Sequence, residues 1–255
     1  MKLGVAMFFT DYSMTPQELG VAAEERGCDS VWSPEHSHIP LSRESAFPSG
    51  GDLPKKYYDA MDPFVALMAA AAVVASIDQL SNGRFLFGVG NGWNKDEMRN
   101  HGTAFETRHK LARERVEAMK AIWSKSKPEY HGEMVNFDPM MTWPKPVQKP
   151  HPPILVGGAF PYGARRAIRY GDGWMPHRAR PQYPNVRDLL PEFRKLAAAA
   201  NREVPVTIWG AKDEDMLKQD RDAGVVRVII SLESAKSGDI LPELDRWSKL
   251  AEKVA

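Results

Sequence analysis

Residues 3–11 of the chain read Leu-Gly-Val-Ala-Met-Phe-Phe-Thr-Asp, a short apolar run followed by a turn that contains no glycine. A continuous apolar run of this length suits a strand that is buried on both faces. A doubly wound sheet would carry its glycine-rich turn directly after this first strand. The composition of residues 9–11 therefore favours a parallel (β/α) barrel, whose site is assembled from several strand-to-helix loops.

The remaining sequence alternates between short apolar strands and helices, which is the pattern of a parallel α/β fold. Seven strands are expected, one fewer than in a complete barrel of this kind, and they begin at Leu3, Asp29, Arg84, Pro153, Gly173, Val204 and Val225. Between the second strand and Arg84 the sequence holds an Ala-rich helix, expected over residues 62–80, and no strand. A strand found between residues 70 and 78 would contradict this interpretation.

The length and composition are those of one globular unit. A chain of 255 residues lies near the roughly 250 residues of a single α/β barrel, so one domain is expected over residues 1–255. Lys plus Arg number 34 and Asp plus Glu 33, which leaves no basic field for nucleic acid. The longest apolar stretch, residues 65–75, is too short to span a bilayer, and residues 1–11 hold no usual signal core. With Cys28 as the only cysteine, we expect a cytoplasmic protein without an intrachain disulfide and without a membrane or nucleic-acid partner.

Histidines follow the second expected strand, at the barrel rim where catalytic groups lie. His36 could act as a general acid or base, because imidazole titrates near neutral pH; alternatively it only packs or forms hydrogen bonds. Glu35 and His38 are its neighbours. His36 and His38 could also form half of a metal site, but His177 is the only further plausible ligand at the other strand ends. We therefore expect no metal.

Two glycine-containing turns follow later strands. Gly88, Gly90 and Gly92 precede Trp93, which could stack on a flat cofactor or simply cover the core. The second turn precedes a helix expected from Gly163, and backbone N–H groups at a helix N-terminus favour phosphate. Its residues are Gly157, Gly158, Ala159 and Phe160, and the arginines nearby are Arg165, Arg166, Arg169, Arg178 and Arg180. An anion site is favoured here over a solvated helix face, because the glycines and arginines coincide.

Seven short segments follow one another in a fixed order along the chain, from residue 1 to residue 174. They are residues 1–11 (MKLGVAMFFTD), 24–32 (EERGCDSVW), 34–36 (PEH), 78–93 (DQLSNGRFLFGVGNGW), 143–146 (WPKP), 153–158 (PILVGG) and 171–174 (GDGW). Together they resemble the luciferase-like monooxygenase superfamily, and more narrowly its F420-dependent oxidoreductases. The resemblance implies a barrel that binds a deazaflavin, F420, or alternatively FMN, at its C-terminal rim.

The resemblance also implies roles for individual residues. It implies that His36 lies at the cofactor ring and handles protons. Asn91, Gly92 and Trp93 would border the cofactor, while the turn Gly157, Gly158, Ala159 and Phe160, with Gly163 and Arg165, would hold its phosphate. Glu97 matches an acidic position common to the subgroup. The implied activity is hydride transfer between F420 and a small organic substrate, carried out by a homodimer.

The sequence departs from the family between the Ala-rich helix and residue 78. On the order of 30 residues are missing there, about one helix-plus-strand unit. The missing strand normally contributes to the cofactor wall. Two alternatives to the enzyme therefore stay open: a non-catalytic relative that binds flavin or F420, and a metal-dependent barrel hydrolase that uses His36 and His38.

Overall fold

The first strand lies at the middle of a parallel sheet in the computed structural model, which describes residues 1–34, 36, 38–59, 67–178 and 182–254. β1 (Lys2–Ala6) pairs with β2 (Ser30–Trp32) on one side and with β9 (Arg227–Ser231) on the other. β8 (Thr207–Trp209) follows on β9. Residues 3–6 are all buried, as expected for a strand covered on both faces.

A second parallel sheet continues the wall. Its order is β3 (Phe87–Val89), β6 (Ile154–Gly157) and β7 (Gly173–Met175). Two isolated bridges, Trp174 to Val206 and His177 to Trp209, join β7 to the β8 side. The wall therefore runs from β2 through β1, β9, β8, β7 and β6 to β3, and the expected seven parallel strands are confirmed.

The two ends of this wall meet without strand pairing. Among the described strands, no ladder joins β2 to β3, and we call this junction the seam. The ring of Trp32 crosses it, since a Cβ built on Gly88 would lie 3.6 Å from the Trp32 ring and 3.0 Å from Met175. Gly88 thus lets the indole approach the backbone of β3.

The seam lies where a strand is missing from the sequence. α2 (Leu67–Leu80) runs without interruption through residues 70–78, so the expected helix is confirmed there. The expected start of the helix, residues 62–66, lies outside the described residues.

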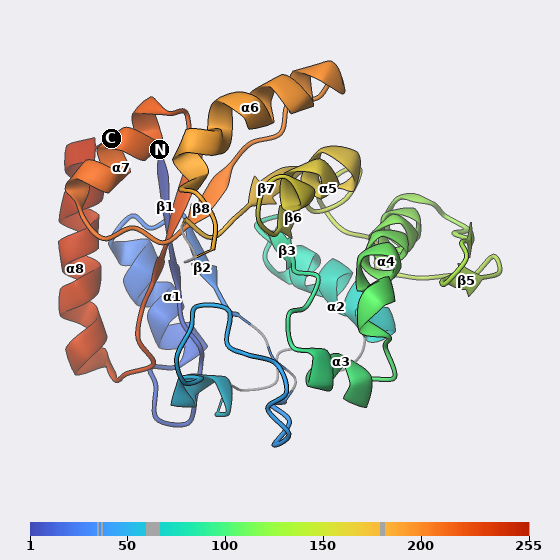
Figure 1. Cartoon of the computed structure of the whole chain (residues 1–255), viewed down its shortest axis with the longest axis horizontal. Coiled ribbons are helices and arrows are strands. Elements are labelled where there is room, and N and C mark those ends of the chain that lie inside the picture. Colours follow the sequence, from blue (N-terminus) through green and yellow to red (C-terminus); the bar gives the residue numbers. More distant parts are fainter. Residues whose placement is uncertain (35, 37, 60–66, 179–181, 255) are drawn as a thin grey trace.

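The other helices lie outside the strands (Figure 1). Residues 15–18 (Thr-Pro-Gln-Glu) carry the sequence pattern of a capping box, and Thr15 and Glu18 form that box at the start of the first of these helices. The helices are α1 (Pro16–Glu25), α3 (Lys95–Asn100), α4 (Arg108–Ser124), α5 (Tyr162–Tyr170), α6 (Val186–Ala199), α7 (Glu214–Asp222) and α8 (Ser237–Val254), with 3-10 turns η1 (Lys55–Tyr57) and η2 (Phe105–Thr107). β4 (Tyr130–His131) and β5 (Asn136–Phe137) form a small antiparallel hairpin away from the wall. No helix of the described chain is long and apolar enough to cross a membrane.

Apolar side chains fill both faces of the wall. Ala6, Trp32, Leu155 and Ile229 form one small buried cluster, against which Leu86, Met175 and Trp209 pack. Their strand neighbours, such as Val5, Val156 and Val228, belong to a larger cluster that also includes helix residues. Because successive side chains on a strand point to opposite faces, the small cluster fills the barrel interior and the large one lies between strands and helices.

Trp32 is expected to carry much of the packing at the seam. Its side chain is 8% exposed, whereas its strand neighbour Val31 is 38% exposed. We expect Trp32→Ala to lower the free energy of unfolding by about 3–5 kcal/mol, the range for a large buried aromatic side chain, and Val31→Ala by less than about 1 kcal/mol. Urea denaturation measures both. Equal losses in the two variants would show that the indole does not support the seam.

Candidate functional site

His36 lies in the loop after β2 and contacts a carboxylate that comes from across the seam. Its Nδ1 lies 2.8 Å from Oε2 of Glu97, and the two side chains are only 12% and 14% exposed. Trp93 donates its indole N–H to Nε2 of His36 at 3.3 Å. Since a carboxylate only accepts and an indole N–H only donates, this geometry assigns the imidazole proton to Nδ1.

Aromatic side chains enclose the imidazole. The His36 ring lies 5.4 Å from that of Tyr57 and 5.5 Å from that of Trp93, both measured between centroids. Tyr57 belongs to η1, in the long loop that follows β2. The ring is therefore held by one charged and one neutral hydrogen-bond partner in a mostly apolar surrounding. Glu35, its neighbour in the chain, lies outside the described residues.

The helix α3 places Glu97 beside His36. Asn94 caps this helix, and its side chain accepts a hydrogen bond from the N–H of Glu97 at 3.2 Å. Sequence analysis did not predict α3, although an Asn followed by Asp96 and Glu97 is a helix-start signal. Glu97, whose role the sequence left open, lies within hydrogen-bond distance of His36.

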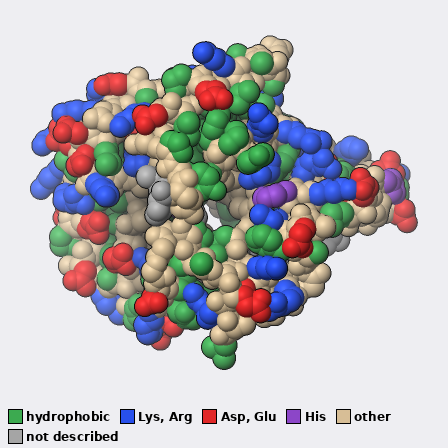
Figure 2. Space-filling view, in the orientation of Figure 1, with side chains coloured by type: hydrophobic (Ala, Val, Ile, Leu, Met, Phe, Trp, Pro, Cys, Tyr) green, Lys and Arg blue, Asp and Glu red, His purple; other side chains and the backbone are tan. Residues whose placement is uncertain are grey.

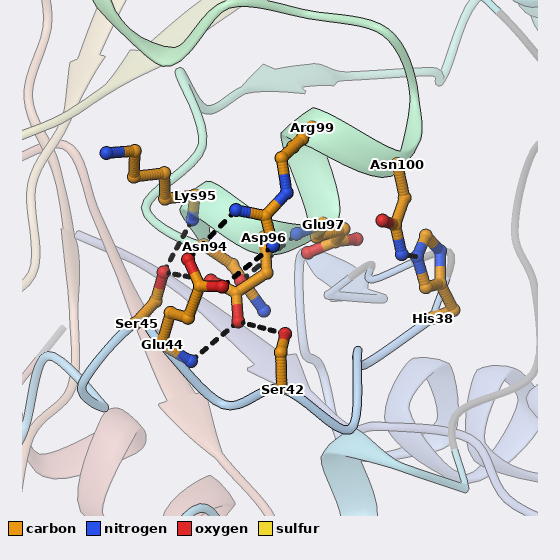
Figure 3. Close-up of polar contacts among 10 residues, drawn as sticks. All are labelled: His38, Ser42, Glu44, Ser45, Asn94, Lys95, Asp96, Glu97, Arg99 and Asn100. Carbon is orange, nitrogen blue, oxygen red and sulfur yellow. Dashed lines mark hydrogen bonds and ion pairs between the residues drawn. The ribbon is translucent and has the colours of Figure 1, made fainter.

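Asp96 fixes α3 to the loop on the β2 side of the seam. Its carboxylate accepts hydrogen bonds from the hydroxyls of Ser42 and Ser45 and from the N–H of Glu44, each at 2.7 Å (Figure 3). Burial acts to raise the pKa of this carboxyl, but the three hydrogen bonds outweigh it and hold the pKa well below its ordinary value. Arg99 adds two 2.9 Å contacts to Glu44.

The turn after β6 has the close backbone packing that its glycines predict. Gly158 has φ of +121°, and a Cβ on Gly163 would lie 2.2 Å from the Gly158 carbonyl oxygen. The same carbonyl accepts the indole N–H of Trp174 at 2.9 Å. The Gly163 N–H donates to Ala159, and the Phe160 ring packs 6.3 Å from that of Trp174. Gly158 itself stays exposed at the rim.

A cationic pocket of about 300 Å³ lies between α4 and α5, directly beside this turn. A Cβ on Gly158 would lie 2.9 Å from the Arg166 guanidinium, so the turn and the pocket adjoin. Figure 2 shows Lys and Arg side chains gathered over α5. The lining residues are His109, Lys110, Arg113, Tyr162, Arg165, Arg166, Arg169 and Tyr170.

Several buried polar atoms at this pocket lack a hydrogen-bond partner among the described residues. They include Nδ1 of His109 and the Nε atoms of Arg113 and Arg166. The Asn91 amide lies near the Tyr170 hydroxyl but makes no hydrogen bond of normal geometry. Burial lowers the pKa of His109 to about 4, and the charges of Arg166 and Arg108 act in the same direction. A pocket of this kind favours an anion, which would satisfy these groups.

The arginines near the turn have different environments. Arg165 is exposed at the edge of the pocket, whereas Arg166 is half-buried and lies against Gly158. Arg178 does not contribute to an anion site, because it pairs with the buried carboxylate of Asp220. Arg180 lies outside the described residues. The sequence therefore listed the arginines near the turn, and the structure shows that Arg166 is the one that lies against Gly158.

The predicted residues fall into two groups. One group surrounds the imidazole and consists of His36 and Trp93, joined by Glu97. The other lies at the cationic pocket and consists of Asn91 and the turn from Gly157 to Arg165. Gly92 lies between Asn91 and Trp93 in the chain and so links the two groups. A Cβ on Gly92 would lie 2.9 Å from Met98. His177 packs 5.8 Å from the ring of Trp209 and does not join His36 and His38 in a possible metal-ligand group among the described residues.

Comparisons with known proteins agree with this fold and show the family. A family model described as luciferase-like monooxygenase matches residues 60–211. An uncharacterized protein of Mycobacterium tuberculosis is 34% identical over all of this chain and 99% of its own length. That alignment runs over 290 positions, 35 more than the 255 residues of this chain, which is close to the size of the missing unit.

Other similar proteins have assigned activities. The FMNH(2)-dependent dimethylsulfone monooxygenase of Pseudomonas putida is 30% identical over 54% of this chain and 39% of its own. The F420-dependent glucose-6-phosphate dehydrogenase of Amycolatopsis mediterranei is 26% identical over 73% of this chain and 60% of its own. A solved monooxygenase of Streptomyces bottropensis covers all of both chains with a TM-score of 0.73 at 19% identity, which shows the shared barrel fold.

The Asp96 hydrogen bonds are expected to make stability depend on pH. The folded carboxyl has a lower pKa than the unfolded one, about 3.9. The stabilisation that the charged Asp96 carboxylate provides is therefore fully present above the unfolded pKa and is lost as the pH falls through the folded pKa. We expect Asp96→Asn to lower the free energy of unfolding by about 1–3 kcal/mol at neutral pH, and the difference from the unmodified protein to shrink as the pH falls from about 5 to about 2.

Asp215→Asn is the matched control, because Asp215 also lies in the first turn of a helix but is exposed. Urea denaturation over the pH range measures all three proteins. A pH-independent gap between Asp96→Asn and the unmodified protein would contradict the role given to the Asp96 charge.

Proposed function

Because the chain belongs to the luciferase-like monooxygenase family, we propose that it is an oxidoreductase that transfers a hydride between F420 and a small organic substrate. The observation that carries this proposal is the cationic pocket beside the Gly157–Gly158 turn. Relatives use F420 or FMNH(2) according to their names, so the choice between these cofactors is part of the proposal.

The pocket fits the anionic end of such a cofactor. Gly158 and Gly163 let the turn pack closely against α5, because a Cβ on Gly163 would lie 2.2 Å from the Gly158 carbonyl oxygen. Arg166 and His109 present buried nitrogens without a hydrogen-bond partner in the described chain. Gly157, Gly158, Ala159, Phe160 and Gly163 would shape the phosphate site, and Arg165 and Arg166 would supply its positive charge. Asn91, Gly92 and Trp93 would border the cofactor between this pocket and His36.

The number of positive charges favours F420 over FMN. Five formal cations line the pocket: Lys110, Arg113, Arg165, Arg166 and Arg169. FMN carries one phosphate group, whereas F420 carries a phosphodiester followed by glutamate carboxylates. An anion with several charges makes fuller use of this cluster, since each added carboxylate can gain a charge-assisted contact.

His36 would handle the proton that accompanies hydride transfer. When bound, the cofactor supplies the redox chemistry. Glu97 holds Nδ1–H and would stabilise the imidazolium that forms when Nε2 takes up a proton, because its carboxylate lies 2.8 Å away. Protonation of Nε2 would displace the Trp93 N–H, whose 3.3 Å contact is the longer of the two.

The seam supports a second candidate function. β2 and β3 lack the strand that would lie between them, and the family normally uses that strand in the cofactor wall. A protein that binds F420 without turnover would fit this feature. The two candidates share the binding pocket and differ in whether hydride transfer occurs.

We also propose that the protein forms a homodimer. Leu80, Met141, Trp143 and Val147 are exposed by 88%, 72%, 65% and 40%, respectively, at the end of α2 and in the proline-rich connector that follows β5. Exposed apolar side chains that gather in this way often mark an interface. Sedimentation that detects only monomer at micromolar concentration would refute the dimer.

Cofactor titration tests the proposed function. We expect F420 to bind more tightly than FMN, and Arg166→Glu to weaken F420 binding at least about 10-fold, more at low salt because screening is weaker there. Arg165→Glu should act in the same direction but less strongly. Arg246→Glu is the matched control, because this substitution makes the same change of charge on a different helix, α8. FMN binding as tight as that of F420, or an unchanged affinity in Arg166→Glu, would contradict the proposal.

Turnover distinguishes the enzyme from the binding protein. We expect His36→Ala to reduce turnover by about 10²-fold, the range for a lost acid or base, while F420 still binds. His131→Ala is the control, because His131 is exposed on the β4–β5 hairpin. Full turnover in His36→Ala would remove this residue from the mechanism, and tight F420 binding without turnover in the unmodified protein would favour the binding function.

A further inference from the structure

Three side chains that could bind a metal ion lie close together at the seam. His38, Glu97 and His101 each offer one ligand atom, and these atoms all lie within 4.8 Å of one another. His38 comes from the loop after β2, whereas Glu97 and His101 come from α3 and its end on the β3 side. Figure 3 shows Glu97 and His38 on the same side of α3.

The local structure brings the three side chains together. His101 follows Glu97 by four residues, and its N–H donates to the Glu97 carbonyl oxygen at 3.2 Å, so both side chains project from one face of the helix end. The His38 and His101 rings lie 5.2 Å apart between centroids. Asn100 lies 3.0 Å from Nε2 of His38 and so can orient this ring, as outer-shell partners of metal-binding histidines do.

We propose that His38, Glu97 and His101 bind a divalent transition-metal ion, of which Zn²⁺ is the best match. Two imidazole nitrogens and one carboxylate oxygen are a common three-ligand set for zinc, with a fourth position open to water. Tetrahedral zinc with bonds of about 2.0–2.1 Å holds its ligand atoms roughly 3.4 Å apart. Side-chain rotations at the partly exposed rim close the remaining gap.

This set of donor atoms does not favour the common hard cations. Mg²⁺ and Ca²⁺ prefer sites made of oxygen atoms, whereas imidazole suits zinc, copper, nickel and iron. The site shares Glu97 with the proposed His36–Glu97 pair, but its ligands and their spacing do not involve a cofactor, so Zn²⁺ binding can be tested without one.

A metal ion here would link the two unpaired edges of the barrel wall. One ligand belongs to the β2 side and two belong to the β3 side, so the ion would add a cross-link where the backbone ladder is missing. An ion that binds only the folded state raises the free energy of unfolding by mass action. The ion would also share the Glu97 carboxylate, whose Oε2 contacts His36.

Metal titration of the full chain, without a histidine tag and after removal of metals with a chelator, tests the site. We expect one Zn²⁺ per chain in calorimetry, a visible absorption band with Co²⁺ that is typical of low coordination, and no comparable binding of Mg²⁺. Zn²⁺ should also raise the melting temperature. His38→Ala and His101→Ala should each weaken Zn²⁺ binding at least about 10-fold and reduce the thermal shift.

Matched variants separate this site from adventitious binding. His131→Ala removes an exposed histidine far along the chain and should leave affinity and thermal shift unchanged. His101→Gln serves beside His101→Ala, because His101 is exposed and neither change should disturb folding, which circular dichroism checks. Lack of stoichiometric Zn²⁺ binding, or equal affinity in His131→Ala and both His101 variants, would overturn the proposal.

Discussion

The unpaired junction between β2 and β3 is the constraint on which the rest of this structure depends. A strand in a parallel wall normally pairs with neighbours on both edges, but within the described part of the chain β2 and β3 each pair with one strand. At the seam, side-chain contacts stand in for backbone pairing. Trp32 crosses the interior, and at the rim Asp96 joins Ser42 and Ser45 while Glu97 joins His36. The loops after the two strands are therefore held together by side-chain polar contacts.

This constraint also explains how the candidate site is organised. In a barrel with an additional strand between β2 and β3, the loop that carries His36 and the helix α3 would be separated by that strand. Here they are adjacent, so Glu97 reaches the imidazole directly. An acidic side chain from the β3 side of the seam therefore lies against the histidine from the β2 side.

The sequence predicted the strands and helices that are specified by residues close to one another in the chain. The apolar runs predicted the seven strands, the Thr15–Glu18 pattern predicted the start of α1, and the uninterrupted Ala-rich stretch predicted α2 through residues 70–78. It could not predict the contacts of Glu97 or Asp96, because their partners lie more than 50 positions away in the chain. It named Arg166 beside the Gly157–Gly158 turn but not His109, since α4 meets α5 only in the folded chain.

The cationic pocket has a consequence for how the protein meets its ligands in solution. The chain carries a formal charge of +1, and five cations line that single pocket, so all other residues together carry a formal charge of −4. An anion that approaches the pocket is thus attracted by five cations, whereas the rest of the chain carries only a small net negative charge. Such a charge distribution guides diffusional encounter toward the pocket and makes the association rate fall as ionic strength rises.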